Sequence, residues 1–159
     1  MDNDYPVLYV FVRSDMPSMS PGKAQAHSGH AANAFTHDYV IMPITSTQSI
    51  DPIVNEWMTS TKQGFGTQIN LKAPWSDVER AVTTALSLNF KADFVTDPTY
   101  PYVVNDEIFG LIPPNVHTDT PINIGNGNYA CFRRERTAAY IFGMKSQLVD
   151  IVGQFPLHP

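Results

Sequence analysis

Apolar and polar positions along the chain follow two periods, one typical of strands and one typical of helices. The run Val7–Val12 is continuously apolar, and Tyr5–Arg13 around it is rich in valine and tyrosine, which predicts a strand buried on both faces. Residues 67–73 alternate polar with apolar side chains and predict a second strand with one buried face. Residues 92–96 and 137–143 predict a third and a fourth strand.

The clearest helix start lies shortly after the first strand. Ser20 precedes Pro21, and this pair predicts a helix from Ser20 to about His37, because the serine hydroxyl can cap the helix and proline has no N–H that needs a partner. Similar capping signals and apolar spacing predict further helices over residues 51–60, 76–88 and 145–152, and a connection over residues 38–49.

Strands separated by helices predict a layered α/β domain. The 159 residues fit one domain over residues 1–159, in which prolines and glycines interrupt residues 98–136 and predict an inserted loop region. No apolar run approaches the length of about 20 residues that crosses a bilayer. The acidic N-terminus is also unlike a signal peptide, so we expect a cytoplasmic protein with no membrane contact.

The first predicted helix carries unusual chemistry on one face. Lys23, His27 and His30 follow at i, i+4 and i+7, beside the backbone N–H groups of the helix start, and this arrangement favours an anion. The other face is small and apolar, as packing on a sheet requires. The polar face can equally be a solvated surface. The sequence gives less support to a metal site that uses His27, His30 and His37, because their spacing is not a known ligand pattern.

Charge limits the partners that the chain can bind. The formal net charge is −5, which argues against a general nucleic-acid coat protein. The basic cluster of the chain is Arg133, Arg134 and Arg136, which lies beside Tyr129 and Phe132. Arginine and aromatic side chains together can stack on bases and clamp phosphates, although the same residues can form the solvated edge of a hairpin.

The residues from the first strand into the first helix resemble a family signature. Residues 12–16 read V-R-S-D-M, residues 19–23 read M-S-P-G-K, and Ala26 and an H-A-A at 30–32 follow. This order resembles the archaeal and eukaryotic type of peptidyl-tRNA hydrolase, whose signature is a strand ending V-R-x-D-L, a G-K, and a helix with A-Q-x-x-H-A. Residues 68–73 and 141–157 resemble the second strand and the C-terminal segment of that family. The resemblance implies a three-layer α/β sandwich with a mixed sheet of about four strands flanked by helices.

The resemblance also implies a reaction, the hydrolysis of the ester bond between a peptide and tRNA. His30 would act as the base or position the water, and Asp97 would orient His30 or share its role. Lys23 would hold a phosphate or stabilise the oxyanion. His27 stands where the family has glutamine, and Thr137 would supply a hydroxyl from the fourth strand. The expected partner is tRNA, a homodimer is left open, and no metal or organic cofactor is needed. Substrate contacts are expected from Arg13, Ser20, Arg133, Arg134 and Arg136.

Three departures from the family pattern leave alternatives open. His27 replaces the glutamine, Asp97–Pro101 replaces a D-A-G-x-T sequence, and the segment that follows is extra. One alternative is a hydrolase or binder of a smaller, nucleotide-like substrate on the same fold, which needs a single cationic pocket instead of an extended basic surface. The other is a non-catalytic interaction module whose contacts come from residues 102–136.

Overall fold

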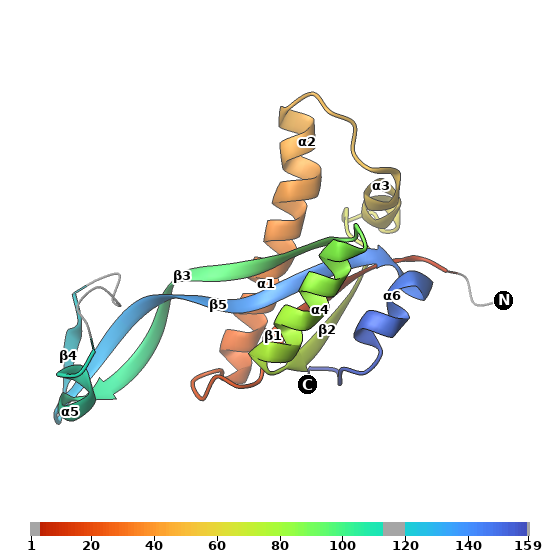
Figure 1. The fold of residues 1–159 in the computed structure, drawn as a ribbon. Coiled ribbons are helices and arrows are strands. Elements are labelled where there is room, and N and C mark those ends of the chain that lie inside the picture. The colour runs from red at the N-terminus through yellow and green to blue at the C-terminus, as the bar shows by residue number, and fades with distance from the viewer. Residues whose placement is uncertain (1–3, 113–119, 159) are drawn as a thin grey trace. The chain divides into compact units, whose positions relative to one another are not determined.

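The computed structural model describes residues 4–112 and 120–158, and it confirms the predicted α/β sandwich. An open mixed sheet of five strands has the order β2-β1-β5-β3, with β4 paired to β5 (Figure 1). Strand β1 runs parallel to β2 and antiparallel to β5. The strands are β1 (Pro6–Arg13), β2 (Thr67–Ala73), β3 (Lys91–Asn105), β4 (Ile122–Gly125) and β5 (Asn128–Met144). The helices are α1 (Pro21–Thr36), the π-helix η1 (His37–Ile41), α2 (Met42–Thr45), α3 (Pro52–Thr59), α4 (Trp75–Ser87), α5 (Asp106–Phe109) and α6 (Lys145–Val152).

The chain forms two compact units. The first unit contains the residues up to Val95 and those from Thr137 onward, and the second contains Thr96–Arg136. Strands β3 and β5 each contribute residues to both units. The single domain over residues 1–159 stays a prediction.

The core of the first unit is built on both faces of β1, as its continuous apolar run predicts. Val7, Tyr9 and Phe11 pack with apolar residues of α4 and α6. Leu8, Val10 and Val12 alternate with them and pack with α1 and α3 on the opposite face. Figure 1 shows the sheet between these two helical layers. A central strand covered on both faces explains why this run lacks polar alternation.

The first helix is longer than its sequence predicts. Helix α1 continues through η1 and α2 to Thr45, where residues 38–49 were expected to form a connection. Pro43 does not stop it, and this proline lies directly after the π-helical turn, in the first turn of α2. The predicted starts of α1 and α3 are confirmed. Ser20 accepts a hydrogen bond from the N–H of Lys23, and Asp51 accepts one from the N–H of Ile53.

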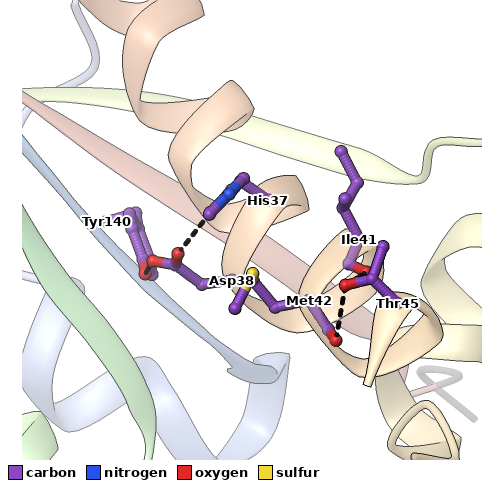
Figure 2. A network of polar contacts seen from close by, with 6 residues as sticks. All are labelled: His37, Asp38, Ile41, Met42, Thr45 and Tyr140. Atoms are coloured by element: carbon purple, nitrogen blue, oxygen red, sulfur yellow. Dashed lines mark hydrogen bonds and ion pairs between the residues drawn. The ribbon is translucent and has the colours of Figure 1, made fainter. Parts of the chain in front are cut away.

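Polar contacts hold the π-helical turn against the sheet. The buried Tyr140 hydroxyl of β5 donates to Oδ2 of Asp38 at 3.1 Å, and Oδ1 of Asp38 lies 2.9 Å from Nδ1 of His37 (Figure 2). Burial raises the pKa of Tyr140 above its ordinary value, and the neighbouring Tyr39 and Asp38 add to this shift. The tyrosine therefore remains a hydrogen-bond donor to this carboxylate.

Three further expectations about local structure are wrong. Helix α4 begins at Trp75 with Pro74 before it, so Ser76 lies inside the helix and does not cap it. The third strand was expected to end at Thr96, but β3 continues through two prolines to Asn105. Strand β3 is the last in the strand order, and prolines are tolerated in such a strand because one side of it needs no ladder hydrogen bonds. Strand β5 likewise begins at Asn128, well before the expected start at Thr137.

The expected loop region of residues 98–136 contains regular structure in its described part. The second unit includes the outer parts of β3 and β5 together with α5 and β4. A tight turn with the sequence G-N-G joins β4 to β5. Gly125, Asn126 and Gly127 have φ values of 90°, 53° and 68°, a conformation that glycine and asparagine adopt most readily.

Candidate active site

Helix α1 packs on the sheet with its small face, as predicted. Ala24, Ser28, Ala31 and Phe35 are all buried there. Lys23 lies in the first turn of the helix and is half-buried. The short side chains bring the helix backbone close to the sheet. The residues of the predicted polar face consequently lie near strand residues as well as near solvent.

His27 is the first of two histidines on the predicted polar face, and it is buried. Its exposed fraction is 4%, and that of Thr137 on β5 is 0%. Nδ1 of His27 lies 3.1 Å from Oγ1 of Thr137, so the two side chains share a hydrogen bond between residues that are far apart in the sequence. His27 therefore anchors α1 to β5, a contact that the helical spacing alone does not reveal.

His30 is the exposed member of this histidine pair. The centroids of the His30 and His27 rings are 5.5 Å apart, and the ring planes meet at 78°. The buried His27 ring thus lies in a T-shaped contact with an imidazole that solvent can reach. A buried neighbour restricts the rotamers of the exposed ring, which favours a defined orientation for a base.

Two predicted substrate contacts have structural partners. Nε and a terminal nitrogen of Arg13 donate to the two carboxylate oxygens of Asp15 at 2.9 and 2.8 Å. The hydrogen bonds from Arg13 hold the pKa of Asp15 below its ordinary value. The Arg13 guanidinium also lies over the Trp75 ring, 5.2 Å from its centroid. Ser20 caps α1. The contacts with Asp15 and Trp75 fix the position of the Arg13 guanidinium.

The remaining predicted residues belong to the second unit. Oδ1 of Asp97 accepts a hydrogen bond from the N–H of Thr99 at 2.8 Å. Arg133 forms an ion pair of 2.8 Å with Glu135, and its guanidinium lies 4.9 Å from the centroid of the Tyr102 ring. Arg134 and Arg136 are exposed and leave β5 on the opposite side from Arg133, because successive strand residues alternate. A shared site for Asp97 and His30 stays a prediction.

A polar cluster lies between α1 and β2, and its residues were not among the predicted site residues. The Ser28 hydroxyl donates to Oδ1 of Asn70 at 2.9 Å. Nε2 of Gln68 donates to Oγ of Ser28 at 3.0 Å and to Oδ1 of Asn70 at 2.9 Å. The polar positions that alternate with apolar ones in residues 67–73 were the sequence feature that could have indicated this cluster. The cluster satisfies a buried serine hydroxyl and fixes α1 above β2.

The part of the chain that the structure describes contains no group of three or more histidine, cysteine, aspartate or glutamate residues placed to hold a metal ion. Within the same residues, none of the helices combines the length and the apolar character needed to span a membrane. Comparisons of the sequence with protein-family models and with curated proteins give no match.

Proposed function

We propose that this protein hydrolyses the ester bond that joins a peptide to tRNA. The observation that carries the proposal is the hydrogen bond between the buried His27 and Thr137, next to the exposed ring of His30. Lys23 lies on the same helix in its first turn. The resemblance of residues 12–32 to the peptidyl-tRNA hydrolase signature adds support, because its lysine and histidine fall on this helix.

The proposed reaction assigns one role to each group. His30 takes a proton from water, and the water oxygen forms a bond to the ester carbonyl carbon. Lys23 stabilises the negative charge that develops on the carbonyl oxygen. When the tetrahedral intermediate breaks down, the ester bond to the ribose breaks and the proton returns from His30 to the leaving hydroxyl. His27 is a positioning residue for His30, and Asp97 is the proposed orienting carboxylate.

The test uses an N-acetylated aminoacyl-tRNA and measures the loss of the ester. Removing a base or an oxyanion donor lowers a rate by about 100-fold or more, so we expect losses of this size for Lys23→Ala and for His30→Ala. Matched controls are Lys62→Ala and His37→Ala, whose side chains are exposed and outside the proposed site. Full activity in both site variants would place the chemistry elsewhere.

A smaller anionic substrate is the second candidate, and the charge balance of the chain favours it. Ten lysines and arginines face fifteen aspartates and glutamates. Binding of tRNA draws on many phosphate contacts and weakens steeply with salt, whereas a small anion depends on one or two. A flat salt dependence of KM, together with cleavage of a short ester mimic at the same rate as the tRNA ester, would select this candidate.

The arginine cluster gives a separate prediction about tRNA binding. Each lost phosphate contact lowers the slope of log affinity against log salt by about 0.7 to 0.9. We expect Arg134→Ser and Arg136→Ser together to weaken tRNA binding without changing cleavage of a minimal ester. Arg133→Ser should have the smaller effect on binding, because Glu135 and Tyr102 already engage that guanidinium. Arg80→Ser is the control, and an unchanged salt slope in the double variant would locate the tRNA surface elsewhere.

A further inference from the structure

One face of the sheet in the second unit is packed against protein. Strand β5 is the central strand there, with β3 and β4 as its neighbours. The Phe109 ring of α5 stacks on Tyr129 of β5, with 4.4 Å between ring centroids. Arg133 lies on the same side of β5, and its guanidinium is 4.9 Å from the centroid of the Tyr102 ring. Cys131, between these two β5 residues, is fully buried. We call this side of the sheet the covered face.

The opposite side of the same sheet is open to solvent. Ala130, Phe132 and Arg134 alternate with the residues of the covered face, so their side chains leave β5 on the other side. Ile122 of β4 is the cross-strand partner of Ala130, and Val103 of β3 lies on this side by the same alternation. Val103 is 63% and Ile122 is 55% exposed. We call these five residues the open face.

The central strand places an aromatic ring beside a cation on the open face. Phe132 and Arg134 are two residues apart on β5, which is roughly 6.5 to 7 Å along a strand. Within residues 4–112 and 120–158, the Arg134 side chain makes no hydrogen bond or ion pair, and the Phe132 ring stacks on no other ring. Arg133, in contrast, is paired with Glu135 on the covered face. One guanidinium and one half-buried ring are therefore available to a ligand.

The charges of the second unit are divided between the two faces. Glu135 belongs to the covered face, and Asp106 and Glu107 belong to α5, which packs on that face. On the open side, Asp97 and Arg136 at the inner ends of the strands have opposite charges. Arg134 therefore gives the open side a net positive charge, although the chain as a whole is acidic. A negatively charged partner is favoured at this side.

We propose that the open face binds the unpaired 3′ end of tRNA, with one base stacked on Phe132 and a phosphate paired with Arg134. Single-stranded RNA commonly binds on open sheets, where bases stack on exposed aromatic rings and arginines contact the phosphates. Val103 and Ile122 add apolar surface beside the ring. This inference rests on the proposed function, in which tRNA is the substrate. It excludes Tyr129 from base stacking, because that ring is stacked on α5.

The test measures the binding of the full chain to a fluorescently labelled single-stranded RNA that ends in C-C-A and carries no ester. Fluorescence anisotropy gives the affinity at several salt concentrations. The same RNA annealed to its complement is the control. We expect the single strand to bind at least about fivefold more tightly, because bases within a duplex cannot stack on a protein side chain.

Two variants separate the contribution of the ring from that of the charge. Phe132→Leu keeps an apolar side chain, and it should weaken binding at least about fivefold without changing the salt slope. Arg134→Ser should lower the slope of log affinity against log salt by about 0.7, since one phosphate contact is lost. Phe65→Leu and Arg80→Ser are the matched controls at exposed positions of the first unit, and they should bind as the wild type does.

The possible outcomes separate this inference from the proposed function. Weaker binding in both open-face variants supports the inference whether or not the protein cleaves the ester of an N-acetylated aminoacyl-tRNA. Equal RNA affinity in Phe132→Leu and the wild type, or no preference for the single strand, would overturn it. Sedimentation of the free protein tests the other occupant of an apolar face, a second copy of the chain. Dimerisation that is lost in Ile122→Ser would assign the open face to that copy and would also overturn the inference.

Discussion

Replacing Thr137 with valine tests the contact on which the proposed site depends. Valine has nearly the same shape as threonine, so the change removes Oγ1 with little change in packing volume. Nδ1 of His27 then loses the partner that lies 3.1 Å away, inside a region where His27 is 4% and Thr137 0% exposed. A buried polar atom without a partner costs about 1 to 3 kcal/mol.

Urea unfolding measures this loss. With a slope of about 2 kcal/mol per molar urea, the expected decrease in the free energy of unfolding shifts the midpoint down by about 0.5 to 1.5 M. Thr137→Ser is the control that keeps the hydroxyl and removes one methyl group. A double-mutant cycle with His27→Leu isolates the interaction energy between the two side chains. In the double variant both hydrogen-bonding groups are replaced by apolar side chains, so neither is left buried without its partner.

The coupling energy from this cycle decides the outcome. Side chains that share a hydrogen bond give coupling energies of about 0.5 to 3 kcal/mol, and we expect a value in this range. Independent effects of the two substitutions would refute the reasoning, since they would show that His27 and Thr137 do not depend on each other.

Two further predictions concern the helices and the sheet. Tyr140→Phe removes the donor to Asp38 and should cost about 0.5 to 1.5 kcal/mol. Because burial raises the pKa of Tyr140, the stability that this group contributes is complete below the unfolded tyrosine pKa of about 10 and is lost as the pH rises above it. Stability measured from pH 9 to 11 should therefore fall less steeply in Tyr140→Phe, and equal slopes would contradict this account. Gly29→Ala should raise the thermal midpoint, since its Cβ meets nothing within 4 Å and alanine favours a helix by about 0.5 to 1 kcal/mol. Gly66→Ala should lower the midpoint, because its Cβ would lie 2.6 Å from Cδ1 of Trp57, and equal midpoints for the two variants would be the contrary result.

Sequence patterns correctly predicted the helices and strands whose own residues contain the cap or the apolar pattern that the fold uses. Residues 67–73 alternate polar with apolar and form β2 with these bounds, and Ser20 caps α1 as expected. The apolar run of β1 is covered on both faces. In each case a short stretch of sequence contains the physical cause of the structure.

The remaining features depend on contacts that a local pattern does not contain. Strand β3 passes through Pro98 and Pro101 because its position in the sheet tolerates them. The helical course of residues 37–45 is supported by Tyr140, which is distant in sequence. For the candidate site, helical spacing put Lys23, His27 and His30 on one face, but His27 is buried and shares a hydrogen bond with Thr137, 110 positions further along the chain.

The rate of ester loss from an N-acetylated aminoacyl-tRNA, measured for the wild-type protein and for His30→Ala at equal concentrations, tests the central claim most directly. The proposed mechanism predicts release of free tRNA by the wild type and a rate lower by about 100-fold or more in the variant. An ester that stays intact at high concentrations of the wild-type protein, or equal rates for the two proteins, would contradict it.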